Sequence, residues 1–349
     1  MTRAAATAAI RPILYGLLAA FLFGASTPAA KHLLHSVGPA TLAGLLYLGA
    51  ALAVLPFVRR GGSAELRRQP RCLLCLASAV LFGGVIGPFL LMAGLRLAPS
   101  ASTSLWLNLE TVATSLLAWL FFREHMGPRA WLAAALIIAA GAILAAPSDF
   151  ALGWPAALVA LACVAWGLDN NFTALIDGFT PAQSTLAKGL IAGMANLAIG
   201  HALGEPRPEA ALLAGALAVG ALGYGLSLVL YVSCAQAVGA ARSQLIFSAS
   251  PFIGVLLAWI ALGESLSTGQ LVAAGLVAVA LAAVFSGGHV HAHHHRTLAH
   301  THAHAHDDEH HTHSHPDLPP NHHHTHAHAH EETRHVHPHH PDLHHRHGH

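Results

Sequence analysis

Glu110 is the first residue whose type and position could carry chemistry, because it lies inside an apolar stretch, 101–122. On a helix that rises 1.5 Å per residue, it is roughly 14 Å from the start of that stretch and roughly 18 Å from its end. An ionisable group at such depth is costly in lipid, so it usually faces the protein interior and serves a function. We expect Glu110 to exchange protons or to bind a substrate amine. The alternative is a protonated side chain that only hydrogen-bonds a neighbouring helix.

The residues around Glu110 indicate which face of its helix is polar. A period of 3.6 residues puts three side chains on the face of Glu110 and leaves a fourth polar side chain nearby on another face. The three are Thr103, Trp106 and Thr114, and the fourth is Asn108. We expect this set, apart from Thr114, to line a substrate site together with Glu110.

A second polar group lies in the apolar stretch 153–175. Asp169 and Asn170 share a helix face with Trp166 and Thr173. Polar groups within a membrane need partners. We therefore expect Trp166, Asp169 and Asn170 to border a water-filled site, while plain interhelical hydrogen bonding is the alternative.

Further polar candidates are weaker. They are Gln244 and Ser248 in the stretch 243–262, and Ser26 and Thr27 in the stretch 12–31. Pro28 follows Thr27 and lacks an N–H, so it can free a backbone carbonyl and break or kink its helix. Lys188 lies about six residues inside the stretch 182–201. Its charged end can reach back to the cytoplasmic surface, and binding of an anionic group is the alternative.

Histidine dominates the end of the chain, where residues 289–349 hold 27 of the 31 histidines. Neutral imidazole suits Zn, Cu, Ni and Co. The metal ligands expected in the densest part are His310, His311, His313, His315, His322, His323, His324, His326, His328 and His330. The segment has too little apolar surface to form a core, so we expect it to be disordered. Low-complexity drift is the alternative to a physiological metal role.

The elements that must position these residues are membrane helices. Of the 349 residues, 54% are hydrophobic and 9% are charged, against about 25% charged in a soluble domain. Ten apolar stretches of roughly membrane length follow one another, namely 12–31, 40–58, 72–95, 101–122, 129–146, 153–175, 182–201, 211–234, 243–262 and 268–286. The composition therefore predicts an all-α polytopic membrane protein in contact with lipid. A net charge of +1 gives no case for nucleic acid binding.

Loop charges predict the orientation of the chain. Ten Lys and Arg residues fall on the side of the N-terminus and three on the other side. Because cytoplasmic loops carry the excess of positive charge, we expect a multi-pass protein of the cytoplasmic (inner) membrane with both termini in the cytoplasm.

The chain is internally duplicated. "LLAWLFFRE" (116–124) matches "LLAWIALGE" (256–264) at an offset of 140 residues. Each half then has five helices, and an odd number requires the second copy to enter the membrane from the opposite side. Such inverted repeats place substrate sites near the bilayer midplane. The expected domains are 1–147 and 148–286, followed by the tail, 287–349.

Two motifs of the halves are similar to those of a known family. They are Phe23-Gly24 and Trp166-Gly167 in the first helix of each half, and Glu124 and Glu264 at the end of each fourth helix. With the two five-helix repeats, residues 12–286 resemble the EamA-type carriers of the drug/metabolite transporter superfamily. Phe23 departs from the usual Trp. The resemblance implies a carrier fold and a small metabolite as substrate.

We therefore expect a secondary transporter of a small organic metabolite, working by alternating access and assisted or regulated by a metal-binding tail. The chain has no P-loop and no constellation typical of an enzyme, and no cofactor is required. The alternative is a Ni, Co or Zn transporter whose tail collects or senses the ion. Expected partners are lipid, the substrate and metal ions at the tail; a homodimer is left open.

Overall fold

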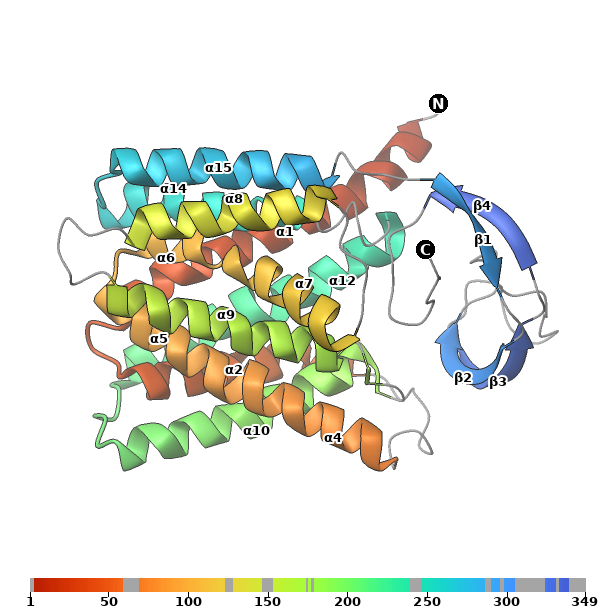
Figure 1. The fold of residues 1–349 in the computed structure, drawn as a ribbon. Coiled ribbons are helices and arrows are strands. Elements are labelled where there is room, and N and C mark those ends of the chain that lie inside the picture. Colours follow the sequence, from red (N-terminus) through yellow and green to blue (C-terminus); the bar gives the residue numbers. More distant parts are fainter. Residues whose placement is uncertain are drawn as a thin grey trace.

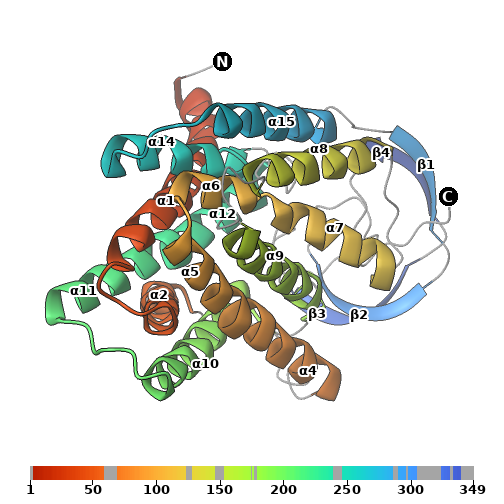
Figure 2. The same ribbon diagram turned by 60° about the vertical axis from the view of Figure 1, so that its left-hand side comes forward.

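The computed structural model of the chain describes residues 3–58, 69–122, 128–145, 153–173, 175–176, 179–238, 246–285, 290–295, 298–304, 324–330 and 333–338. The helices of the first half are α1 (Arg3–Leu33), α2 (Pro39–Val54), η1 (Leu55–Phe57), α4 (Pro70–Ala79), η2 (Val80–Ile86), α5 (Gly87–Leu97), α6 (Ser100–Trp106), α7 (Leu109–Phe122) and α8 (Pro128–Ala145). Those of the second half are α9 (Gly153–Thr173), α10 (Pro181–Ala202), α11 (Ala210–Val219), η4 (Gly220–Leu226), α12 (Ser227–Val238), α14 (Ser250–Leu262) and α15 (Thr268–Phe285). Together they form one bundle (Figure 1, Figure 2).

Helix starts and ends follow from local chemistry. Proline opens several helices, such as α2 at Pro39 and α10 at Pro181, where its missing N–H would lack a partner in any case. Thr180 and Gln183 form a reciprocal capping box at the start of α10. Gly263 ends α14 with a φ of 65°, a left-handed conformation that glycine adopts without strain.

Six helical stretches in the described part of the chain are long and apolar enough to cross a membrane. They are Arg11–Leu33, Pro39–Phe57, Pro70–Leu97, Ser100–Phe121, Gly153–Thr173 and Ala210–Cys234. Shorter apolar helices cover Pro128–Leu144, Ser250–Leu262 and Thr268–Ala283. The chain is therefore a multi-pass membrane protein, while the count of ten spans stays a prediction.

The expected uninterrupted helix over 101–122 is wrong. A turn at residues 107–108 separates α6 from α7, and a similar turn at 248–249 precedes α14. The amide of Asn108 donates to the Leu105 carbonyl, and such local side-chain bonds compete with the helical hydrogen-bond ladder. By contrast, α1 remains helical through Pro28, so the break considered there does not occur.

Two π-helical segments interrupt helices at equivalent positions in the two halves. η2 joins α4 to α5, and η4 joins α11 to α12. Val80 and Gly220, their first residues, are separated by the 140-residue offset of the sequence repeat. π-helical turns are rare in proteins as a whole, but those that occur are often found at functional sites. In such a turn the backbone carbonyls leave the regular pattern of α-helical hydrogen bonds.

Several helix contacts in one half of the chain have a counterpart in the other half. α2 packs on α10 and α8 on α15, so these corresponding elements meet each other. α6 packs on α14, whose counterpart at the 140-residue offset is α7. α1 packs against α12 and α14, while its counterpart α9 packs against α5 and α7. Reciprocal contacts of this kind are what a two-fold relation between halves produces.

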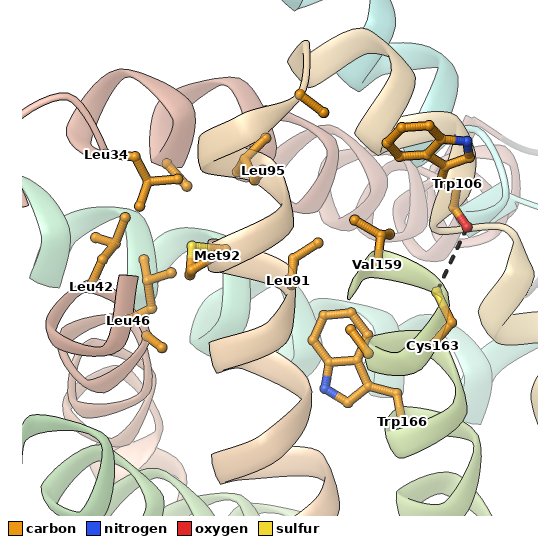
Figure 3. Close-up of a cluster of buried hydrophobic side chains, with 14 of the residues drawn as sticks. Leu34, Leu42, Leu46, Leu91, Met92, Leu95, Trp106, Val159, Cys163 and Trp166 are labelled. Atoms are coloured by element: carbon orange, nitrogen blue, oxygen red, sulfur yellow. Dashed lines mark hydrogen bonds between the residues drawn. The ribbon is translucent and has the colours of Figure 1, made fainter. Parts of the chain in front are cut away.

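The largest apolar cluster joins the halves around α5. Leu91 and Leu95 of α5 are almost fully buried, as are Leu42 of α2 and Val159 of α9 (Figure 3). Trp106, at the end of α6, is 1% exposed in the same cluster. α9 is thereby held against α5, and this contact fixes the helix that carries the second predicted polar group.

Three charged side chains hold helix ends at one end of the bundle, the left-hand end in Figure 1. Glu205 accepts hydrogen bonds from the backbone N–H groups of Ala40 and Thr41, and Glu264 accepts from those of Ser100 and Ala101. Lys31 donates to the last carbonyls of α5 and of the residue that follows it. The charges match the helix dipoles, with anions at N-termini and a cation at a C-terminus.

Four short segments of the tail are described as strands, and the expected disorder of the tail as a whole stays a prediction. β1 (Val290–His295) pairs antiparallel with β4 (Thr333–Pro338), and β2 (Leu298–His304) with β3 (His324–His330). Histidine alternates with Ala and Thr in β2 and β3, and this period of two matches a strand. The alternation is visible in the sequence as H-x-H runs.

Candidate functional site

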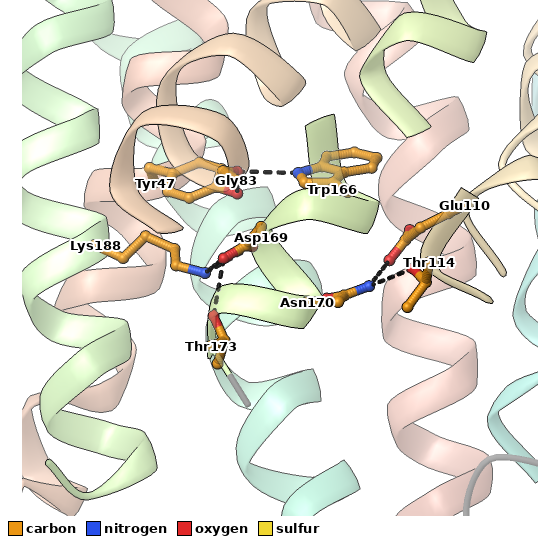
Figure 4. Close-up of polar contacts among 9 residues, drawn as sticks. All are labelled: Tyr47, Gly83, Glu110, Thr114, Trp166, Asp169, Asn170, Thr173 and Lys188. Atoms are coloured by element: carbon orange, nitrogen blue, oxygen red, sulfur yellow. Dashed lines mark hydrogen bonds and ion pairs between the residues drawn. The ribbon is translucent and has the colours of Figure 1, made fainter. Parts of the chain in front are cut away.

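α9 carries the centre of the candidate site and lies between α7 on one side and η2 on the other, with both packed against it. Consecutive helical residues point about 100° apart. Asp169 therefore turns toward α10, while Asn170 turns toward α7 (Figure 4). The two residues build two different polar contacts from adjacent positions.

Asp169 forms an ion pair with Lys188 of α10. The lysine Nζ lies 2.5 Å from Oδ1 and 2.7 Å from Oδ2, and the Thr173 hydroxyl donates to Oδ1 at 2.9 Å. The side chains remain 17% exposed for Lys188 and 10% for Asp169. Two charges at this depth are tolerated because they neutralise each other.

Glycine makes room for this ion pair. A Cβ atom on Gly83 of η2 would overlap the Asp169 carboxylate, and one on Gly84 would lie 3.2 Å from Cγ of Lys188. The carbonyl of Gly83 accepts from the Tyr47 hydroxyl at 2.5 Å and from the Trp166 indole at 2.9 Å. The π-helical segment thus serves as a backbone wall of the site, held in place by side chains of α2 and α9.

Glu110 stands at the first turn of α7, directly after the helix break. The Asn170 amide donates to Glu110 Oε1 at 2.9 Å and to the Thr114 hydroxyl at 3.1 Å. Glu110 is half-buried and Asn170 is exposed. Among the described residues, one ion pair is found, between Lys188 and Asp169. Within the same residues, no cationic side chain therefore lies within ion-pair distance of Glu110.

The structure brings together only part of the predicted set. Glu110, Trp166, Asp169 and Asn170 belong to one connected region, as expected (Figure 4). Thr103 is fully buried and donates to the Pro99 carbonyl of its own helix, and the Trp106 indole donates to the Gly141 carbonyl of α8 at 3.4 Å. Because the break at 107–108 interrupts the helical face, these two residues and Asn108 do not join Glu110.

The remaining polar candidates lie elsewhere. Ser26 is buried and donates to the Phe23 carbonyl, and Thr27 is buried beside it in α1. Ser248 is half-buried in the turn before α14. Gln244 lies outside the described residues.

A row of aromatic rings connects the charged region with the helices around Ser26. Tyr47 lies 6.0 Å from Tyr224 of η4, and Tyr224 lies 5.8 Å from Phe23 of α1, measured between ring centroids. Phe23 in turn lies 5.4 Å from Phe247. The row crosses from one half of the chain to the other, so both halves border the same central region.

The expected metal ligands of the tail are only partly described. His324, His326, His328 and His330 lie in β3, while His310, His311, His313, His315, His322 and His323 fall outside the described residues. Within the part that the structure describes, no three His, Cys, Asp or Glu side chains form a group able to hold a metal. Metal binding by the tail stays a prediction.

The contacts of three residues were not predicted from the sequence. Lys188 turns inward to Asp169 instead of reaching the membrane surface, since pairing neutralises two costly charges. Tyr47 and Gly83 were not predicted as part of the site. A signal for Lys188 was present, because it is the one Lys or Arg that lies several residues inside a predicted span.

The class of protein follows from the fold and this polar region: a multi-pass helical membrane protein with charges paired inside its bundle. The model of the EamA-like transporter family matches residues 10–146 and again 153–286. The chain belongs to this family, which confirms the resemblance predicted from the sequence.

Two known proteins are similar to this chain. An uncharacterized transporter of Methanothermobacter thermautotrophicus is 28% identical over 278 residues, which cover 73% of this chain and 80% of that protein. A solved crystal structure, 20% identical in sequence, superposes with a TM-score of 0.55 over 78% of this chain and 96% of its own. The second likeness concerns the fold alone.

Proposed function

We propose that the protein is a secondary transporter that moves a small organic metabolite by alternating access, with Glu110 as the proton-coupling or substrate-binding group. The observation that carries the proposal is the state of Glu110. It lies at a break in a membrane helix and is hydrogen-bonded to Asn170, and no cation pairs with it in the described region. An intramembrane acid of this kind is a functional group by default.

Exposed polar side chains next to Glu110 support the same conclusion. Asn170 and Thr173 are exposed although they lie in a membrane-spanning helix. Polar groups in contact with lipid tails are unfavourable. A path that admits water and a polar solute along α9 accounts for their position.

The architecture supports alternating access. Ten membrane helices arranged as two inverted five-helix repeats are the proposed topology. The reciprocal helix contacts and the π-helices at equivalent positions fit a two-fold relation between the halves. In such carriers the halves rock around a site near the midplane. The loop charges favour the cytoplasmic membrane and two cytoplasmic termini.

The tail has a separate proposed role. It binds Zn, Ni, Co or Cu and so assists or regulates the carrier. A transition-metal cargo is the weaker candidate, because no observation in the described membrane part favours it. A physiological tail function predicts that deletion of residues 289–349 changes cellular metal tolerance.

The test is a ligand-stabilisation screen of the purified full-length protein against metabolites and metal salts, followed by transport of the compounds that raise its melting temperature. Glu110→Gln should abolish that transport while the protein still reaches the membrane. Undiminished transport by this variant would remove Glu110 from the mechanism. A screen in which only metals stabilise the protein without its tail would favour the metal carrier.

A further inference from the structure

The ion pair between Asp169 and Lys188 links two helices that hardly touch each other. α9 and α10 both pack along η2, but within the described chain they make at most slight direct contact. The lysine Nζ reaches both carboxylate oxygens of Asp169 across this gap. The contact therefore depends on two charges and little else.

The other half of the chain shows that the packing does not need these charges. At the repeat-related place, Gly223 of η4 packs against Ser26 of α1, where a Cβ on the glycine would lie 2.6 Å from the serine Cβ. Ser26 corresponds to Asp169 when Phe23-Gly24 is aligned with Trp166-Gly167, an offset of 143 residues. The position of Lys188 is then taken by Leu45, or by Leu48 at the 140-residue offset, and neither can form an ion pair. The same helix–glycine contact thus forms without an ion pair.

Stability offers little reason to keep a buried ion pair. The cost of removing two charges from water can exceed their attraction, so such pairs are weak contributors to folding. Here the pair is also not fully enclosed, because 17% of the Lys188 side chain is exposed. Asp169 has a second donor, the Thr173 hydroxyl, that remains if the lysine moves away.

We propose that Lys188 binds an anionic group of the carried molecule, a carboxylate or a phosphate, which displaces Asp169, and that Asp169 then takes up a proton. The inference rests on the proposed transport function and names its substrate class. The one covalent change is at Asp169, where an O–H bond forms with one proton taken up from the surrounding solution while Lys188 stays protonated and pairs with the anion. Substrate and proton are thereby bound together.

The groups around Asp169 are compatible with this exchange. Lys188 of α10, Tyr47 of α2 and Glu110 of α7 are the titratable side chains that interact with it electrostatically among the described residues. η2, which packs against α9, presents the backbone of Gly83 there. Once the anion has taken Lys188, a charged Asp169 would lack a cation and would lie near a second carboxylate, so protonation removes both penalties.

The experiment measures anion binding and proton uptake by the full-length protein in detergent. Sodium acetate and sodium phosphate are separate arms, each matched to sodium chloride of equal ionic strength. We expect one or both salts to raise the melting temperature of the protein. Binding of the anion should be accompanied by uptake of about one proton per protein, and this uptake is measured with a pH indicator in lightly buffered solution. The paired variant Lys188→Gln with Asp169→Asn keeps the side-chain sizes and leaves no unpaired charge, and it should lose both responses.

Arg207→Gln is the matched control, because it removes an exposed positive charge away from the site; its responses should equal those of the unchanged protein. Equal anion responses in the paired variant, or binding without proton uptake, would overturn the proposal. If transport still depends on Glu110 in that case, only the anion site falls. If anions bind as expected and no metabolite is transported, the transport function falls instead.

Discussion

Gly83→Ala is the perturbation with the clearest structural consequence. A methyl group at this position would overlap the Asp169 carboxylate and would lie 2.7 Å from its Cβ, closer than carbon atoms approach in folded proteins. The carboxylate must move, and with it the bonds to Lys188 and Thr173. Inserting a methyl group into a packed site costs about 1–3 kcal/mol. We expect the melting temperature in detergent to fall by several degrees.

The controls for this variant are two other helical glycines. A Cβ on Gly141 would meet its nearest neighbour at 3.6 Å, and one on Gly275 would have no neighbour within 4 Å among the described residues. Alanine is a better helix former than glycine by about 1 kcal/mol. Gly141→Ala and Gly275→Ala should therefore be neutral or slightly stabilising. If Gly83→Ala had the same melting temperature as these two controls, the packing described around Asp169 would be refuted.

The coupling between Gly83 and Asp169 can be measured directly. In an Asp169→Ala background the carboxylate is absent, so the added methyl group at residue 83 should cost less than in the unchanged protein. Contacting residues show interaction energies of roughly 0.5–3 kcal/mol in such double-mutant cycles. Additive effects would place the two residues out of contact.

Three further predictions concern other parts of the chain. Glu264→Gln should lower the free energy of unfolding by about 1–3 kcal/mol, because the Glu264 carboxylate caps α6. Glu209→Gln is the control, because it alters an exposed N-cap residue that forms no side-chain cap bond, and it should change stability little. Equal melting temperatures of the two variants would contradict the cap. Trp166→Phe removes the indole donor to Gly83 and should cost about 1 kcal/mol in melting experiments, whereas no loss would show that the bond is dispensable. Deletion of residues 289–349 should abolish high-capacity Zn²⁺ binding in calorimetry, and full retention would place the metal ligands elsewhere.

Membrane class, family and much of the polar region could be predicted from the sequence because they depend on composition and local pattern. Apolar stretches of membrane length are a direct consequence of bilayer thickness. Glu110 and Asp169 stood out since charges inside such stretches are rare. The internal repeat was visible as a 140-residue offset, and the family model matches twice along the chain.

The partners of these residues depended on tertiary contacts that no local pattern encodes. Lys188 lies near a predicted helix end, where reaching the surface is the ordinary behaviour of lysine. Its pairing with Asp169 requires Gly83 and Gly84 to leave space on η2. Likewise, the break at 107–108 moved Thr103 and Trp106 away from Glu110, because a helical face continues only as far as the helix itself.

The central claim, that Glu110 is the coupling or binding group, is tested most directly by comparing proton-driven transport in the unchanged protein and in Glu110→Gln. The unchanged protein and the variant are reconstituted in liposomes, and the metabolite selected by the stabilisation screen is followed under an imposed pH gradient, with Glu209→Gln as a control. We predict accumulation by the unchanged protein and the control, and its loss in Glu110→Gln with melting behaviour retained. Accumulation by Glu110→Gln at the level of the unchanged protein would contradict a site built around this residue.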